Sequence, residues 1–205
     1  MNAPTKISES GLTLESAEAR HALALADLFA RTNTPCNCQY WHFTGDKNAW
    51  LERIFHASEE NRAAFIASFE AGSAELKGVV ASSEGRAVGW LKLCPAERLP
   101  KLYDQRLYKS LPCFAGDRTG VLAIGCMLVD EDFRRRGVAR SMVEAAIKLA
   151  ETRGARAIEA FPRRSDQLGA PELWLGPLGV FLDAGFQIVN DFGPYPVLRY
   201  AVNGI

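Results

Sequence analysis

A short arginine-rich turn that leads into a helical pattern is the part of the sequence best suited to chemistry. It follows an apolar strand-like run and consists of Arg134, Arg135, Arg136, Gly137, Val138, Ala139, Arg140 and Ser141. The first turn of a helix leaves backbone N–H groups without intrahelical partners, and the helix dipole adds partial positive charge there. Glycine at position 137 lets a phosphate approach the backbone, and neighbouring arginines add charge-assisted hydrogen bonds. The turn therefore predicts a binding site for a pyrophosphate.

The spacing in this turn resembles the cofactor motif of the GNAT acyltransferases. That motif is an arginine or glutamine, two variable residues, a glycine, one variable residue, and then a glycine or alanine. Arg134, Gly137 and Ala139 stand at the fixed positions here. The resemblance covers about residues 76–202 in the family's order of elements, including a Gly-Phe turn at 185–186. Segments 36–41, 88–90 and 159–162 further resemble a largely uncharacterised bacterial branch of that superfamily.

This resemblance implies that the chain uses acetyl-CoA, or another acyl-CoA, as a co-substrate. The strand before the turn would offer backbone groups to the pantetheine arm at Met127, Leu128 and Val129, and residues 134–141 would hold the pyrophosphate. A buried central strand without a ligand has the same side-chain pattern. Family members usually transfer the acyl group directly to an amine in one ternary complex, without a covalent acyl-enzyme.

The groups that would transfer protons do not follow the family pattern. Many members carry a tyrosine as general acid in the helix before the Gly-Phe turn, and the best-matching residue here is Phe181, which cannot donate a proton. Some members carry a glutamate base early in the strand before the turn, but residues 121–124 have no titratable group. Either water serves, or the chain binds CoA without catalysing transfer, or another side chain replaces these groups. The candidates for replacement are His42, Glu159, Asp130 and Cys126.

Three of these candidates also have an ordinary structural interpretation. His42 is typical of a surface loop, and Glu159 of a paired or edge-exposed residue on an apolar strand. Cys126 is typical of a small core hydrophobe, and a nucleophilic role would require an activating neighbour.

An aromatic and cysteine-rich segment at 35–46 offers two further hypotheses. Tyr40 and Trp41 are candidates for the wall of the acceptor pocket, together with Trp90, although a packed aromatic loop has the same composition. Cys36, Cys38 and His42 could ligate zinc, but they supply only three ligands without a second paired half, so we predict no metal site. The segment ends at Asp46, which is suited to cap a helix.

Composition excludes several classes of protein. Of 205 residues, 48% are apolar and 23% charged, with a formal net charge of zero, which is typical of a globular protein and not of a dedicated nucleic-acid binder. The acidic residues beside 134–136 neutralise that basic run. No apolar run approaches the length of a membrane span, residues 1–6 lead into polar sequence, and five irregularly spaced cysteines argue against a disulfide framework. We therefore expect a cytoplasmic protein whose partners are small molecules.

The hydrophobic pattern predicts strands at 11–14, 76–82, 87–93, 121–129, 157–161, 186–189 and 197–202. Helices are predicted at 19–32, as a pair within 47–71, at 137–153 and within 173–184, and residues 95–112 form an amphipathic insertion. By the resemblance, the fold is α/β, with one mixed, mostly antiparallel sheet that is split at strand 121–129 and covered by helices on both faces. We expect one domain over residues 1–205, with an acceptor-side region at 1–75 and the CoA-binding core at 76–205.

The function predicted from these features is acyl transfer to the amine of a small molecule or a peptide. A CoA-binding or regulatory module without turnover is the first alternative, and an ordinary α/β domain whose turn binds no phosphate is the second. The sequence identifies neither the acceptor nor an interface, although homodimers are common in the family.

Overall fold

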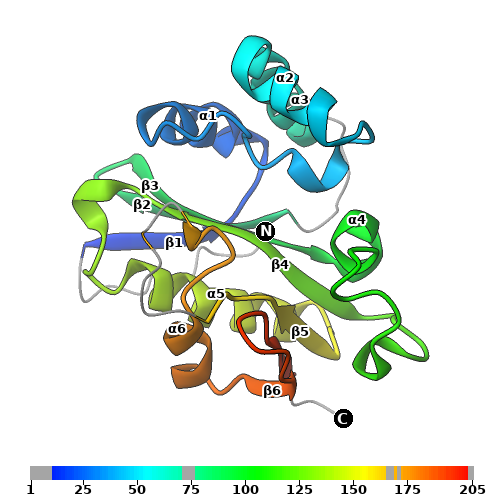
Figure 1. Ribbon diagram of the computed structural model, residues 1–205. Helices are drawn as coiled ribbons and strands as arrows, with labels where there is room; N and C mark the ends of the chain where they lie inside the picture. Colours follow the sequence, from blue (N-terminus) through cyan, green and yellow to red (C-terminus); the bar gives the residue numbers. More distant parts are fainter. Residues whose placement is uncertain (1–10, 71–76, 165–168, 170–171, 203–205) are drawn as a thin grey trace.

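The centre of the protein is a seven-stranded sheet (Figure 1), seen in a computed structural model that describes residues 11–70, 77–164, 169 and 172–202. The strands follow the order β1-β2-β3-β4-β5-β7-β6, and every neighbouring pair is antiparallel except β4 and β5. Their bounds are β1 Leu12–Ser16, β2 Gly78–Ser83, β3 Arg86–Pro95, β4 Val121–Val129, β5 Ala157–Ala160, β6 Gln187–Asn190 and β7 Val197–Ala201. The predicted mixed, mostly antiparallel sheet is confirmed.

Strand β4 is paired along one edge and largely free of β5 along the other. Its residues from Leu122 to Val129 pair with β3, whereas β5 pairs only with Val121, Leu122 and Ala123. Strand β5 is four residues long and is followed by Pro162, which has no N–H to donate to a ladder. The second half of β4 therefore parts from β5, as the expected split requires.

A bulge interrupts β4 where it begins to diverge. Lys92 pairs with Cys126 and Leu93 with Ile124, so Gly125 is an extra residue on β4. The buried indole of Trp41 donates a 2.7 Å hydrogen bond to the Gly125 carbonyl. The aromatic segment near residue 41 is thereby tied to the middle of β4.

Helices cover both faces of the sheet, as predicted (Figure 1). Helices α1 to α3 lie on one side and α5 and α6 on the other, while α4 lies near the start of β4. Their bounds are α1 Ala22–Arg31, α2 Lys47–His56, α3 Ser58–Glu70, α4 Pro100–Tyr103, α5 Val138–Thr152 and α6 Leu178–Asp183. The Asp46 carboxylate accepts the Ala49 N–H at 2.8 Å and caps α2, as its position in the sequence indicated.

Apolar side chains form a core on each face of the sheet. Helix α5 buries the predicted four-residue repeat of Val138, Met142, Ala146 and Ala150 against β1 to β5. The opposite face packs α1 and α3 around Trp90, and a separate cluster forms beneath the insertion after β3. Strand β4 contributes to all three clusters, so both its faces are buried.

Several predicted boundaries differ from the structure. The short helix expected within 173–184 is found at Leu178–Asp183, after Gly176 with its φ of +92° and the N-cap Pro177. The helix expected at 19–32 begins as a 3-10 turn at Ala19–His21, and the insertion is mostly turns around the short α4. The expected helix end at 71, strand start at 76 and boundary between 75 and 76 lie outside the described residues.

A buried carboxylate fastens the insertion to the sheet. Glu159 of β5 is fully buried and accepts hydrogen bonds from the Tyr103 hydroxyl at 2.6 Å, Arg118 at 2.7 and 3.0 Å, and Arg199 at 2.6 Å. Burial and the adjacent carboxylate raise the pKa of Tyr103 well above its usual range, so this hydroxyl stays protonated. Glu159 thus joins α4, the loop before β4, and β7.

Replacement of Glu159 by Gln should lower the free energy of unfolding by about 3–5 kcal/mol, since it leaves two guanidinium groups without their buried counter-charge. Urea denaturation at pH 7 measures this change. The control is Asp191→Asn, which removes an exposed ion pair with Arg164 at 2.8 Å and should cost no more than about 1 kcal/mol. Equal losses in the two variants would contradict the structural role given to Glu159.

Candidate functional site

The N-terminus of α5 is open at the predicted pyrophosphate site. Its N-cap is Gly137, with a φ of +81° and no side chain to cap the helix. A Cβ built on Gly137 would meet no atom within 4 Å, so the space beside Gly137 is open. The first N–H groups of a helix have no intrahelical partner and point along its axis. This turn can therefore donate several backbone hydrogen bonds to an anion.

The arginines around this turn differ in what they contact. The Arg134 Nε donates to the Val129 carbonyl at 3.2 Å, and its guanidinium pairs with Glu131 at 3.3 Å. Arg140 pairs with Asp183 of α6 at 2.6 Å. Arg135 and Arg136 are exposed beside Gly137, and Arg135 has a φ of +58°. The first two brace the turn, and the other two place positive charge at its surface.

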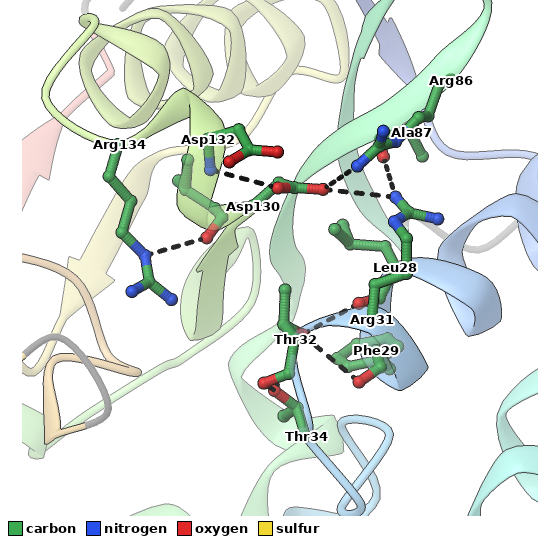
Figure 2. A network of polar contacts seen from close by, with 11 residues as sticks. Leu28, Phe29, Arg31, Thr32, Thr34, Arg86, Ala87, Asp130, Asp132 and Arg134 are labelled. Carbon is green, nitrogen blue, oxygen red and sulfur yellow. Dashed lines mark hydrogen bonds and ion pairs between the residues drawn. The ribbon is translucent and has the colours of Figure 1, made fainter.

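Asp130, at the end of β4, holds the turn to the rest of the sheet (Figure 2). Its carboxylate accepts a 2.7 Å hydrogen bond from Arg86 of β3 and lies 3.5 Å from Arg31 of α1. It also accepts the Asp132 N–H at 3.3 Å, which closes the turn before Arg134. The side chain of Asp130 is 7% exposed. A carboxylate engaged on three sides in this way positions the turn.

The two arginines keep Asp130 ionised. Burial acts to raise the pKa of this carboxyl, but the hydrogen bonds from Arg86 and the Asp132 amide, with the charges of Arg86 and Arg31, hold it below its ordinary value. The group is therefore a carboxylate at neutral pH, already engaged by its partners.

The free edge of β4 is covered by the chain itself. The Met127 N–H donates a 2.7 Å hydrogen bond to the Trp174 carbonyl, and the Val129 carbonyl accepts from Arg134. Gly176 allows the covering segment to approach, because a Cβ there would lie 2.7 Å from the Phe181 ring and 3.1 Å from Met127. Two backbone groups assigned by sequence to the pantetheine arm thus have partners within the chain.

Phe181 lies in the core of the α5 face. Its side chain is fully buried, and its ring is 5.3 Å from that of Phe186. The position where many family members carry a tyrosine therefore presents no hydroxyl.

The structure places the four candidate proton-transfer residues in different surroundings. Glu159 and Asp130 are held by arginines as described above, His42 is exposed on the wall of a cavity, and Cys126 is buried. These four residues do not converge on one point, and sequence alone gave no means of seeing their partners.

Cys126 lies against Cys38 in a buried pair of hydrogen-bonded thiols. The Trp90 indole N–H also lies 3.4 Å from the Cys38 sulfur. Burial raises the pKa of Cys38, but the bonds from Cys126 and Trp90, with the charge of Lys92, lower it below its ordinary value. The hydrogen bond to Cys38, together with burial, raises the pKa of Cys126. Neither thiol lines the cavity.

The aromatic residues of segment 40–50 pack mainly on one another. The Tyr40 ring lies 4.8 Å from Trp41 and 5.3 Å from Trp50, and Trp41 lies 5.4 Å from Trp174. The Lys101 ammonium is 4.4 Å from the centre of the Tyr40 ring. Tyr40 and Trp41 thus form a packed cluster that also contacts the segment covering β4.

A cavity of about 520 Å³ lies on the face of β3 that is turned away from α5. Of the three residues predicted at the acceptor pocket, Trp90 lines this cavity, and Tyr40 and Trp41 do not. Its basic lining residues, Lys77, Lys92 and Arg98, were not predicted. Lys92 interrupts the apolar run of β3, and that interruption is the one signal in the sequence that pointed to them.

The described part of the chain has neither a metal-binding cluster nor a membrane-spanning helix. No group of three or more His, Cys, Asp or Glu side chains in these residues is arranged to hold a metal ion. Within the same residues, no helix has both the length and the apolar character needed to cross a membrane.

A model of the acetyltransferase (GNAT) family matches residues 39–176, which is more than half of the chain. The chain belongs to the GNAT acetyltransferase family. The predicted family and the enzyme class of a GNAT-type N-acetyltransferase are thereby confirmed. No curated protein matches the sequence.

Solved structures of GNAT proteins share the fold at low sequence identity. An acetyltransferase of the GNAT family from Listeria monocytogenes is 16% identical, with a TM-score of 0.58, over 96% of this chain and 99% of that one. The PaiA N-acetyltransferase from Thermoplasma acidophilum, in complex with coenzyme A, is 9% identical with a TM-score of 0.52, over 93% and 98%. YncA from Salmonella typhimurium, a putative acetyltransferase with its cofactor acetyl-CoA, is 14% identical with a TM-score of 0.52, over 95% of both.

Asp130 should stabilise the folded state to a degree that depends on pH. We call its contacts with Arg86, Arg31 and the Asp132 N–H the Asp130 clamp. Because its pKa is lower in the folded state, the stabilisation is fully present above the unfolded value of about 3.9 and is lost as pH falls through the folded value. Asp130→Asn should therefore lower the free energy of unfolding by about 1–3 kcal/mol at pH 7, and its difference from wild type should shrink as pH falls below about 4. Urea denaturation across this range measures both effects.

Asp132→Asn is the matched control, because Asp132 is exposed in the same turn and contributes its backbone N–H to the clamp. It should change stability by less than about 0.5 kcal/mol. A pH-independent loss for Asp130→Asn, or an equal loss for both variants, would contradict the ionised clamp.

Proposed function

We propose that the protein transfers an acyl group, preferably acetyl, from acyl-CoA to the amine of a small molecule or a peptide. The amine attacks the thioester directly. The observation that carries this proposal is the open first turn of α5 behind Gly137, in a chain of the GNAT family. Bound acyl-CoA supplies an activated thioester carbonyl to this reaction.

The residues of the turn fit a pyrophosphate. The N–H groups of 138–140 belong to the first turn of a helix of 15 residues, and glycine leaves the approach to them clear. The exposed guanidinium groups of Arg135 and Arg136 lie beside Gly137 and add positive charge. Asp130 and Arg134 hold this turn against the end of β4.

The free edge of β4 fits the extended pantetheine arm. Met127 presents its N–H and Val129 its carbonyl along this edge, where the Trp174 carbonyl and the Arg134 side chain engage them in place of a neighbouring strand. On this account, the Trp174 carbonyl gives up its hydrogen bond with Met127 when the arm binds.

The acceptor amine must lose a proton before it attacks. For an amine with a pKa near 10.4 this costs about 4–5 kcal/mol at pH 7. Among the four candidate groups, only His42 combines exposure with a place on the cavity wall, and we propose it as the group to test first as a base. Glu159 and Asp130 already neutralise arginines.

A CoA-binding module without turnover is the second candidate. The observation that favours it is Phe181, a buried ring where many family members carry the general acid. Both candidates require CoA at the α5 turn, and only the first requires transfer to an amine.

The test of the shared site is calorimetric titration with acetyl-CoA. Gly137→Glu should weaken binding at least tenfold relative to Gly137→Gln, which corresponds to about 1.4 kcal/mol, because only the former places a carboxylate against the pyrophosphate. The two variants have similar size and the same backbone strain at φ +81°, so their difference isolates the charge.

Gly154→Glu is the second control, because Gly154 also has a positive φ and open surroundings but stands at the other end of α5. It should bind acetyl-CoA as wild type does. Absence of binding to wild type, or equal binding by the two Gly137 variants, would contradict the proposed site. Binding without acylation of any amine in a broad panel would favour the module without turnover.

A further inference from the structure

The cavity on β3 has an unusual concentration of positive charge. Among the residues that the structure describes, Lys77, Lys92 and Arg98 line it, together with the carboxylate of Glu97. With His42 neutral, these described lining residues carry a net charge of about +2, in a protein whose overall formal charge is zero. An excess of cationic side chains around a concave site attracts and orients anions.

Aromatic side chains also line this cavity. Phe65 and Phe69 of α3 and Trp90 of β3 contribute to it, and each of the three side chains is at least nine-tenths buried. Their rings pack edge to face, with Phe65 5.9 Å from Trp90, so this aromatic surface is fixed by its own packing. The cavity therefore offers both aromatic surface and cationic groups to a ligand.

One lining residue of the cavity, Lys92, lies next to the bulge of β4. Lys92 pairs with Cys126, and its Cδ lies 3.3 Å from the position that a Cβ on Gly125 would occupy. Lys92 thus extends over the bulge, on the face of the sheet opposite α5. A molecule in the cavity would approach β4 from that face.

We propose that this cavity binds the acyl acceptor, and that the acceptor is a small amine carrying an anionic group, a carboxylate or a phosphate-type group, on an apolar body. The reaction step rests on the proposed function, whereas recognition of the anion does not. The volume of about 520 Å³ falls within the range of about 300–1,000 Å³ typical of small-molecule sites.

The same charges assist the chemistry. A cationic surrounding disfavours the ammonium form of a bound amine and lowers its pKa, so less free energy is needed to expose the nucleophilic lone pair. Recognition of the anion and deprotonation of the amine would then come from one set of side chains. This reduces the demand on a dedicated base.

The test compares amines that differ mainly in charge. L-Phenylalanine should be acetylated with a kcat/KM at least tenfold higher than phenylalaninamide, which keeps the body but replaces the carboxylate with a neutral amide. The phosphonate analogue of phenylalanine distinguishes the two kinds of anion. Lys77→Met and Arg98→Met should each reduce the preference for the acid several-fold, whereas Glu97→Gln should increase it. Lys109→Met, which removes an exposed lysine outside the cavity lining, should leave the preference unchanged.

Calorimetry supplies a readout that needs no turnover. N-Acetylphenylalanine should bind the free protein more tightly than N-acetylphenylalaninamide, and the two Met variants should weaken binding of the acid alone. Equal affinity for acid and amide, or a preference that Lys77→Met and Arg98→Met leave unchanged, would overturn the proposal. Selective binding of the acid with no acetylation of any amine would support the anion site and contradict the proposed function.

Discussion

The separation of β4 from β5 is the constraint on which the rest of the structure depends. Only three residues of β4 pair with β5, and the following residues are left with an edge that no strand fills. The segment around Trp174 and the side chain of Arg134 satisfy backbone groups along this edge. The same strand leads through the Asp130 clamp into the N-terminal turn of α5, so one strand sets both the edge and the proposed anion site. A β4 paired along its whole length would leave no room for a ligand beside it.

The proposed cofactor site and the proposed acceptor cavity lie on opposite faces of the sheet. Helix α5, on one face, has at its N-terminus the proposed pyrophosphate site, while the cavity on β3 opens on the other face beneath α3. The bulge at Gly125 lies between them and is held by Trp41 on the cavity side. The proposed acceptor therefore meets the thioester at β4 from the face opposite α5. The buried network around Glu159 keeps the insertion in place and is not required to move protons.

Local signals predicted much of this arrangement. The apolar run of β4, the four-residue repeat of α5 and the cap at Asp46 are patterns within one segment, and each is found where it was expected. The role of Glu159 depends on Tyr103, Arg118 and Arg199, which come from three separate segments, so no local pattern revealed it. The residues that line the cavity also come from separate segments of the chain, so no local pattern revealed them together. The contact between Trp174 and Met127 was also unpredictable, since a backbone hydrogen bond leaves no trace in side-chain types.

The most direct test of the central claim is a crystal structure of the protein with CoA. We predict the pyrophosphate at the N–H groups of residues 138–140, and the pantetheine arm along β4, with the Met127 N–H donating to the arm in place of the Trp174 carbonyl. A CoA molecule bound elsewhere, or one that leaves both the first turn of α5 and the edge of β4 without contact, would contradict the account.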